Sequence, residues 1–314
     1  LPEFQHHERL KHLIFAQQCN RELLDHLCQV ASMIRAMSRH REGQDFLTRL
    51  LSHRRAMLYF TQPSTRTFLS FMAACQILGI VCNEIRDPAL SSEFKGESPL
   101  DSIRMFSSYF DLIVMRSPQA KFAECCAYLM SELDGRQQRS VPIVNAGSGA
   151  DEHPTQALLD IYTIQRSFEF TSPKEGVRSA ARFELLRRKY PDLQRGLGGK
   201  TYGFCGDVGR GRTVRSLTTL LALWPDVRFV FIYPDYAKLA PYEDMLARLR
   251  AMGVKVEHSH SLAEVAGELD VLYMTRIQHE HDTEEDQAFF ETYDPSSFAL
   301  SSELLARMKD YCAI

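Results

Sequence analysis

The 314-residue chain lacks an excess of positive charge, a long hydrophobic run and a paired cysteine motif. Its 37 basic and 40 acidic residues give a net charge of −3, so no overall basic field indicates a nucleic-acid partner. No hydrophobic run approaches the roughly 20 residues that a membrane-spanning helix needs. None of the eight cysteines forms a CxxC pair, which favours reduced thiols over a disulfide framework. The composition predicts a cytoplasmic globular protein that binds neither nucleic acid nor membrane.

Short apolar runs alternate with helix-like patterns along most of the chain. Most of these runs are apolar at consecutive positions, which is typical of parallel strands covered on both faces. The expected strands are residues 56–60, 79–85, 111–116, 141–146, 200–207, 227–233, 254–258 and 270–276. The expected helices include residues 21–38, 67–78, 153–166, 212–223 and 241–252. This alternation predicts an α/β protein with parallel sheets.

A stretch rich in Ser, Pro, Gly and basic residues interrupts the alternation at residues 167–199. Four of the expected strands precede it, and four follow it. We therefore expect two doubly wound domains, each with a parallel sheet covered by helices, joined by an interdomain helix that begins near His153. The predicted domains are residues 1–152 and 153–314. Residues 167–199 are predicted to be a surface insertion that is partly helical.

Hydroxyl and guanidinium groups follow the first expected strand. The motif "STRT" places Ser64, Thr65 and Thr67 around Arg66, between a strand and a helix. Free N–H groups at a helix start favour an anion, and hydroxyls with a guanidinium can complete a phosphate cradle. The structural alternative is a capping box around Thr65 with a solvated Arg66, which is the commoner fate of such a motif taken alone.

Two further polar clusters follow strands of the first half. Arg116 ends the third strand, at an edge where open parallel sheets bind ligands. His153 and Gln156 stand at a helix start, where His153 could donate a hydrogen bond to a carbonyl or exchange a proton with it. A solvated arginine and a capping histidine without a catalytic role are the structural alternatives.

The second half repeats this arrangement. "GDVGRGRTVRSL" follows a strand and carries Arg210, Arg212 and Arg215, which favours an anionic ligand. Its glycines do not have the GxGxxG spacing, so a nicotinamide cofactor is only weakly supported. "TRIQ" ends the last strand with Arg276 and Gln278, which could hold a carboxylate through two hydrogen bonds. The histidine pairs at residues 258–260 and 279–281 lack a further cluster with ligand spacing, so we expect no metal.

Six motifs in order carry a family resemblance: "PSTRT", "KGES", "MRSP", "HPTQALLDIYTI", "GDVGRGRTVRSL" and "YMTRIQ". From about residue 10 to the end, the chain resembles the aspartate/ornithine carbamoyltransferase family. "HPTQ" with "TRxQ" is similar to the aspartate-using branch. The resemblance implies transfer of the carbamoyl group of carbamoyl phosphate to L-aspartate, giving N-carbamoyl-L-aspartate and phosphate for de novo pyrimidine biosynthesis. It implies no cofactor and no metal.

The resemblance also implies a role for each matching residue. The residues implied to bind carbamoyl phosphate and to act in catalysis are Ser64, Thr65, Arg66, Thr67, Arg116, His153 and Gln156. Those implied to bind aspartate are Lys95, Arg212, Arg276 and Gln278. The family further implies a homotrimer with shared active sites, in which Ser91, Ser92 and Lys95 reach a neighbouring subunit. A regulatory or pathway partner is compatible with this arrangement.

Three positions depart from the family pattern. Phe68 replaces the second arginine of "STRTR", so it either packs or removes a charge near the phosphate. Gln62 replaces a glutamate and His281 an arginine, and in relatives these two residues belong to ionic contacts that close the domains. Relatives also continue beyond the position of Ile314 into an "HPLPR" loop that lines the acceptor site.

These departures keep other functions open. The main alternative is a catalytically weak paralogue that acts as a binding or regulatory subunit. A carbamoyltransferase with another amine acceptor and a nucleotide-dependent dehydrogenase are less well supported, because Arg276 and Gln278 fit aspartate and the glycine spacing does not fit a dinucleotide.

Overall fold

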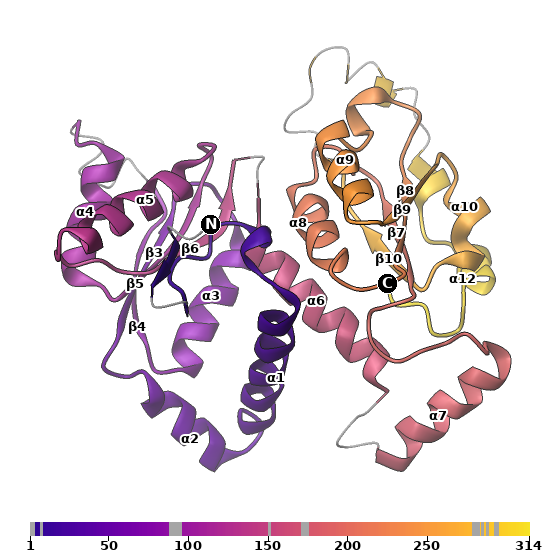
Figure 1. Ribbon diagram of the computed structural model, residues 1–314, viewed down its shortest axis with the longest axis horizontal. Helices are drawn as coiled ribbons and strands as arrows, with labels where there is room; N and C mark the ends of the chain where they lie inside the picture. Colours follow the sequence, from indigo (N-terminus) through magenta and orange to yellow (C-terminus); the bar gives the residue numbers. More distant parts are fainter. Residues whose placement is uncertain are drawn as a thin grey trace. The chain divides into compact units, whose positions relative to one another are not determined.

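The computed structural model describes residues 4–6, 9–87, 96–149, 152–170, 176–277, 283, 286, 289–291 and 295–314. The chain forms two compact units, Leu1–Leu158 and Leu159–Ile314, and each contains a four-stranded sheet (Figure 1). The predicted domain boundary after residue 152 lies just before helix α6 (Pro154–Glu169), whereas the division between the units falls inside this helix.

The sheet of the first unit is parallel throughout. It consists of strands β3 (Arg55–Phe60), β4 (Val81–Ile85), β5 (Leu112–Ser117) and β6 (Ile143–Ser148), in the order β4-β3-β5-β6. Strand β4 begins two residues later than expected, because Gly79 has a φ of +75° that ends the preceding helix and turns the chain. A short antiparallel hairpin, β1 (Gln5–His6) and β2 (Arg9–Leu10), precedes this sheet.

Helices cover both faces of this sheet because strand side chains alternate in direction. Met57 and Tyr59 point to a core that includes residues of α4 (Pro99–Tyr109) and α5 (Phe122–Gly135). Leu58 and Phe60 point to the opposite core, which α3 (Thr65–Ile77) completes. Two further helices, α1 (Arg21–Met37) and α2 (Arg41–Leu50), pack beside each other, and α2 contacts α3.

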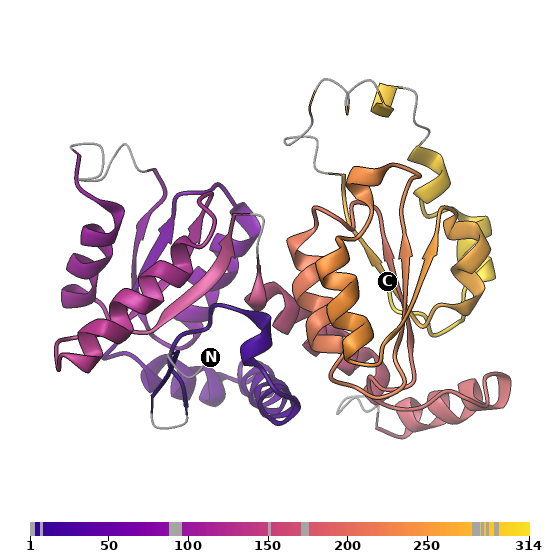
Figure 2. The same cartoon turned by 45° about the horizontal axis from the view of Figure 1, so that its top comes forward.

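The second unit repeats the parallel arrangement with the order β10-β7-β8-β9. Its strands are β7 (Thr201–Cys205), β8 (Arg228–Ile232), β9 (Lys255–Ser259) and β10 (Val271–Met274). Helices α8 (Arg212–Leu221) and α9 (Glu243–Ala251) lie on one face, and α10 (Leu262–Val265) and α12 (Ser302–Arg307) lie on the other (Figures 1 and 2). Both units are therefore doubly wound, as predicted.

The stretch 167–199 contains the helix α7 (Gly176–Lys189), close to the expected helical part. Its end is fixed to the last residues of the chain. Lys189 lies 2.7 Å from the carboxylate of Asp310, and the rings of Tyr190 and Tyr311 meet edge to face at 5.0 Å. The insertion is thus packed against its own unit.

Three expectations from the sequence can be compared with the structure. No helix of the described residues is long and apolar enough to cross a membrane. All eight cysteines are free thiols. The expectation that most strands are covered on both faces holds for β3 and β5, whereas the edge strands β4 and β9 leave several side chains exposed.

Candidate functional site

The carboxyl ends of β3 and β5 lie where the first sheet changes its winding direction. Along the chain β3 is followed by β4 on one side, and β5 then pairs with the other side of β3. Loops diverge at such a switch point, and open α/β sheets bind ligands there. The register sets Phe60 beside Arg116, so the "STRT" and "MRSP" segments leave the sheet next to each other.

The "STRT" motif forms the start of α3. Ser64 is the N-cap residue in extended conformation, yet its side chain makes no capping hydrogen bond. The capping box around Thr65 is therefore not formed. Thr65 and Arg66 are exposed, and Thr67 is half-buried. Three hydroxyls and one guanidinium thus surround a helix start, whose partial positive charge favours an anion.

Arg116 is held in place by neutral backbone groups. Its side chain is buried, and Nη1 donates a hydrogen bond to the carbonyl of Ala146 at 3.1 Å. The carbonyl of Arg116 accepts hydrogen bonds from the backbone N–H of Gln62 at 3.3 Å and the hydroxyl of Thr61 at 3.4 Å. The carbonyl of Ala146 thus helps to orient the guanidinium of Arg116 at the carboxyl end of β5.

His153 immediately precedes α6 and is 4% exposed. The backbone N–H of Gln156 donates to its Nδ1 at 3.3 Å, and the hydroxyl of Thr155 lies 3.3 Å from the same atom. His153 therefore does cap the helix, which was the structural alternative. A neutral ring that accepts at Nδ1 carries its proton on Nε2. This tautomer is the one that can donate to a carbonyl oxygen.

Two buried residues that the sequence analysis did not single out support this loop. Asn145 donates to the carbonyl of Ile14 at 3.0 Å and accepts from the N–H of Gly147 at 2.9 Å. Glu152 accepts from the N–H of Ala16 at 3.3 Å and from the Gln17 amide at 3.0 Å. Both residues could have been found in the sequence, because Glu152 is the carboxylate next to His153 in "DEHPTQ" and Asn145 is an asparagine at the end of an apolar strand.

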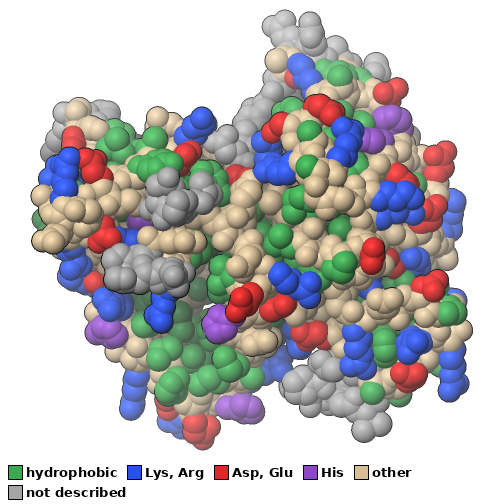
Figure 3. All heavy atoms as spheres, in the orientation of Figure 1, with side chains coloured by type: hydrophobic (Ala, Val, Ile, Leu, Met, Phe, Trp, Pro, Cys, Tyr) green, Lys and Arg blue, Asp and Glu red, His purple; other side chains and the backbone are tan. Residues whose placement is uncertain are grey.

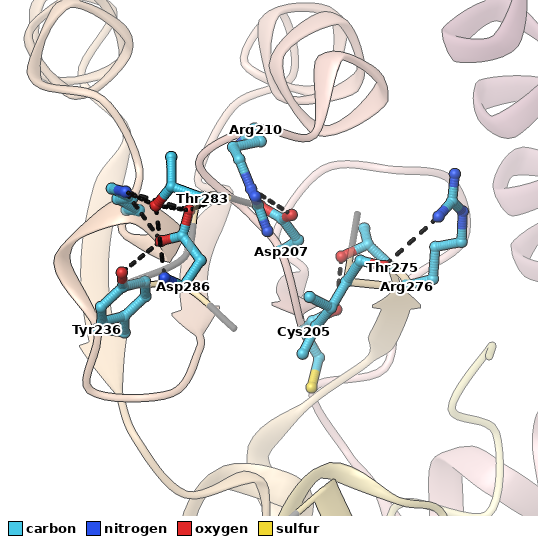
Figure 4. Close-up of polar contacts among 10 residues, drawn as sticks. Cys205, Asp207, Arg210, Tyr236, Thr275, Arg276, Thr283 and Asp286 are labelled. Carbon is cyan, nitrogen blue, oxygen red and sulfur yellow. Dashed lines mark hydrogen bonds and ion pairs between the residues drawn. The ribbon is translucent and has the colours of Figure 1, made fainter. Parts of the chain in front are cut away.

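The second unit has its own switch point between β7 and β10. Chain order leads from β7 through β8 to β9 on one side, and β10 returns to the other side of β7. The backbone N–H of Thr275 donates to the carbonyl of Cys205 at 2.7 Å (Figure 4). Gly206 has a φ of +109°, and a Cβ there would lie 2.3 Å from the carbonyl oxygen of Thr275. Glycine is therefore required where the two strand ends meet.

The three arginines of "GDVGRGRTVRSL" have different surroundings. Arg210 forms an ion pair with Asp207 at 2.8 Å. Arg215 lies 3.4 Å from Asp244, and its guanidinium lies over the ring of Tyr242. Arg212 is the first residue of α8 and is half-buried. Arg210 and Arg215 therefore have carboxylate partners within the protein, and Arg212 is the one of the three that the family resemblance implies as a ligand of aspartate.

Arg276 lies two residues after the end of β10 and is exposed. Its Nη1 lies 3.4 Å from the carbonyl of Ile277 (Figure 4). Three residues earlier, within β10, Tyr273 Oη donates to the buried carboxylate of Asp160 at 2.9 Å. Burial raises the pKa of Tyr273, so the phenol stays protonated and acts as a donor. This hydrogen bond links β10 to α6.

Five predicted residues lie outside the described residues: Ser91, Ser92, Lys95, Gln278 and His281. The other two departures from the family pattern are described. Phe68 is 5% exposed and meets the ring of Phe60 edge to face at 5.4 Å, so it packs in the core. Gln62 is half-buried next to Arg116.

Metal ligands do not gather in the part of the chain that the structure describes, since it has no group of three or more His, Cys, Asp or Glu side chains that could hold an ion. Of the histidine pairs, the one at residues 258–260 contacts Tyr233. Nδ1 of His258 lies 3.1 Å from the Tyr233 hydroxyl, and Nδ1 of His260 lies 2.9 Å from the Tyr233 carbonyl. The pair at residues 279–281 lies outside the described residues.

Both halves of the chain are similar to known proteins. Residues 11–166 match the "Aspartate/ornithine carbamoyltransferase, carbamoyl-P binding domain", and residues 198–314 match the "Aspartate/ornithine carbamoyltransferase, Asp/Orn binding domain". The catalytic subunit of aspartate carbamoyltransferase from Methanosarcina acetivorans is 34% identical over 86% of this chain and 74% of its own length. Aspartate carbamoyltransferase 2, chloroplastic, from Pisum sativum is 36% identical over 87% of this chain, which spans 60% of the pea protein.

Solved structures give the same result. Aspartate transcarbamoylase from Trypanosoma cruzi, in complex with carbamoyl phosphate and aspartate, has a TM-score of 0.74 and 30% identity over 96% of this chain and 83% of its own. The catalytic subunit from M. jannaschii has a TM-score of 0.71 and 31% identity over 94% of this chain and 82% of its own. Because both domains match and the identity extends over most of the chain, the protein belongs to the aspartate/ornithine carbamoyltransferase family.

Proposed function

We propose that this protein transfers the carbamoyl group of carbamoyl phosphate to the amino group of L-aspartate, giving N-carbamoyl-L-aspartate and phosphate. The observation that carries the proposal is the placement of the anion-binding side chains at the switch point of each sheet. Relatives support it, since the T. cruzi enzyme has been solved with both substrates. The step serves de novo pyrimidine biosynthesis.

The domain of residues 1–152, together with the start of α6, binds carbamoyl phosphate in this proposal. Ser64, Thr65 and Thr67 donate hydroxyl hydrogen bonds to its phosphate, and Arg66 and Arg116 supply positive charge. Nε2–H of His153 donates to the carbonyl oxygen, with Gln156 at the carbamoyl nitrogen. The aspartate amine attacks the carbonyl carbon, the bond to the phosphate oxygen breaks, and a proton of the amine passes to the departing phosphate. Negative charge grows on both oxygens, and fixed donors stabilise it.

The domain of residues 153–314 binds aspartate. Arg212 at the start of α8 and Arg276 after β10 pair with its two carboxylates, with Gln278 and Lys95 as further donors. The exposed position of Arg276 beyond the carboxyl end of β10 supports this role. Charge-assisted hydrogen bonds from guanidinium groups fix both the position and the orientation of a carboxylate.

The activity test measures phosphate released from carbamoyl phosphate with and without L-aspartate. Release that depends on L-aspartate, and that L-ornithine does not replace, is the expected result. Arg276→Ala is the matched variant, and it should raise the KM for L-aspartate without changing the binding of inorganic phosphate. Binding of both substrates without turnover would contradict the proposal and support the alternative of a catalytically weak binding or regulatory subunit.

Assembly and location complete the proposal. We infer a homotrimer with shared active sites, to which Ser91, Ser92 and Lys95 contribute from a neighbouring subunit. Apolar side chains gather on the surface of the first unit at α1 and α2 (Figure 3), including Met33 and Phe46, which are 57% and 55% exposed. Such a patch is typical of a contact surface, for another copy or for a regulatory partner. The free cysteines support a reducing compartment such as the cytoplasm, although the pea relatives are chloroplastic.

A further inference from the structure

Arg86 lies over the ring of Phe68. The guanidinium carbon is 4.6 Å from the ring centre, within the distance of a cation–π contact. Phe68 is buried and belongs to the first turn of α3, directly after Thr67. Arg86 is exposed. A cation from another strand is thus held against the helix start that carries the "STRT" motif.

The sheet register explains this position. Arg86 follows β4 immediately, and Ile85 pairs with Tyr59 in the parallel neighbour β3. Arg86 therefore leaves the sheet level with Phe60, at the same carboxyl edge from which the "STRT" segment starts. The edge-to-face contact of Phe60 with Phe68 keeps the ring over the end of β3. At this edge of the sheet, Arg86 follows β4, the "STRT" motif follows β3, and Arg116 is the last residue but one of β5.

The charge of Arg86 is not neutralised within the described chain. Its contact with the Phe68 ring is its one interaction there, and no hydrogen bond or ion pair joins it to another described residue. The aromatic face orients a guanidinium while leaving all its N–H groups able to donate. Ser64 lies one helical turn before Phe68 on the same side of α3, so its unused hydroxyl and this guanidinium face the same region.

We propose that Arg86 is a further phosphate-binding residue of the carbamoyl phosphate site, positioned by Phe68. The inference rests on the proposed function. Phe68 stands where the family resemblance implies an arginine, and Arg86 brings a guanidinium back to that place from the neighbouring strand. The packed ring of Phe68 then positions the guanidinium of Arg86, which supplies the positive charge. The ligand chemistry is that of a phosphate dianion at a helix start.

The test measures the dissociation constant of inorganic phosphate by calorimetry at low ionic strength. Arg86→Gln should weaken phosphate binding about tenfold, the effect of one charge-assisted hydrogen bond. The difference should shrink as salt is added, because exposed charges are screened. Arg49→Gln is the matched control, since Arg49 is an exposed arginine of α2, which precedes the opposite, amino end of β3. It should leave phosphate binding unchanged.

A charge-relocation variant separates binding from packing. Phe68→Arg alone should lower stability, because it places a second guanidinium against Arg86 in a buried position. Phe68→Arg combined with Arg86→Gln should bind phosphate more tightly than Arg86→Gln alone, since the guanidinium is restored on the other residue. A purely structural role of Arg86 predicts altered thermal stability with unchanged phosphate binding.

The outcomes distinguish this inference from the proposed function. Arg66→Ala should abolish phosphate binding if the site is the expected one. Unchanged binding in Arg86→Gln, together with lost binding in Arg66→Ala, would overturn the role of Arg86 and leave the proposed function standing. Failure of the unmodified protein to bind phosphate would overturn both. Loss of phosphate affinity in Arg86→Gln that relocation of the charge restores would establish Arg86 as a ligand.

Discussion

Arg210 donates two hydrogen bonds to the fully buried carboxylate of Asp207, from its backbone N–H at 3.1 Å and from Nε at 2.8 Å (Figure 4). The pair closes the Gly-rich turn between β7 and α8. Arg212 stands two residues later, at the first position of the helix. The turn therefore contains one arginine that holds the loop in shape and one that the proposed function assigns to the substrate.

Substitution of Arg210 should lower the stability of the protein, whereas substitution of Arg212 should weaken the use of aspartate. Arg210→Ala should lower the free energy of unfolding by about 3–5 kcal/mol, because it leaves the Asp207 carboxylate buried without its cation. Arg212→Ala should raise the KM for L-aspartate at least about tenfold, as expected for a lost charge-assisted pair. Urea unfolding and steady-state kinetics measure the two effects. A larger kinetic defect in Arg210→Ala than in Arg212→Ala would contradict the assignment.

The stability of the protein should depend on pH through His12. This ring is fully buried, and burial lowers the pKa of His12 from 6.5 to about 4. The folded state therefore binds the proton less readily than the unfolded state. The contribution of the neutral ring is fully present above pH 6.5 and is lost as the pH falls from 6.5 toward 4, with a total on the order of 3 kcal/mol.

His12→Asn provides the control for this pH dependence. The backbone N–H of Ile143 donates to Nδ1 of His12 at 3.1 Å, and an asparagine oxygen can accept the same hydrogen bond without titrating. Denaturant unfolding at several pH values between 7.5 and 4.5 should show a shallower loss of stability for the variant. Equal slopes for both proteins would assign the acid sensitivity to other groups.

Asp286, beyond β10, has a buried carboxylate that accepts several hydrogen bonds. Asp286 is 1% exposed and accepts hydrogen bonds from the Tyr236 hydroxyl, from the Thr283 N–H at 2.7 Å and from Lys238 at 3.1 Å (Figure 4). These donors hold the pKa of Asp286 well below the ordinary carboxyl range. The ring of Phe289 stacks on Tyr236 at 4.3 Å. Asp286 and Phe289 are thereby held against Tyr236, in the loop after β8.

Removal of the hydrogen bond between Tyr236 and Asp286 should weaken the binding of aspartate more than the binding of phosphate. Tyr236→Phe takes away one donor and retains the stacked ring, so we expect a modest fall in melting temperature and a rise in the KM for L-aspartate. The dissociation constant for inorganic phosphate should stay the same, because its proposed ligands belong to the other unit. Tyr242→Phe, at an exposed tyrosine of the same unit, is the control. A parallel change for both ligands would point to general destabilisation.

The shared active site of the proposed trimer can be tested by complementation. Lys95→Ala and Arg66→Ala should each be nearly inactive as homotrimers, because every site then lacks one cation. Mixed by reversible dissociation, they should recover part of the activity, since some sites in hybrid trimers carry neither substitution. Hybrids of verified composition that stay inactive, or a protein that is monomeric in solution, would remove Lys95 from the proposed site.

Local features of the sequence were sufficient to predict the eight strands of the two parallel sheets, but the β1–β2 hairpin and several helices, such as α2 and α5, were not predicted. Each of the eight strands is a short, mostly apolar run between turn-forming residues, as in residues 227–233, and each is found within a few residues of its expected bounds. The helix within residues 167–199 was also expected from its local pattern. The chemistry of the candidate site could be read in the same way, because a guanidinium or an imidazole directly after a strand is visible without any tertiary contact.

Tertiary structure alone decided how these elements combine. The order of strands places the switch points between β3 and β5 and between β7 and β10, and pairing between distant segments leaves no local signal in the chain. The fates of the arginines depend on the same contacts. Arg215 has a carboxylate on the next helix, and Arg86 has an aromatic ring on a neighbouring element. The sequence determines which charges exist, but only the packed fold determines which of them are already neutralised, since that depends on groups far apart along the chain.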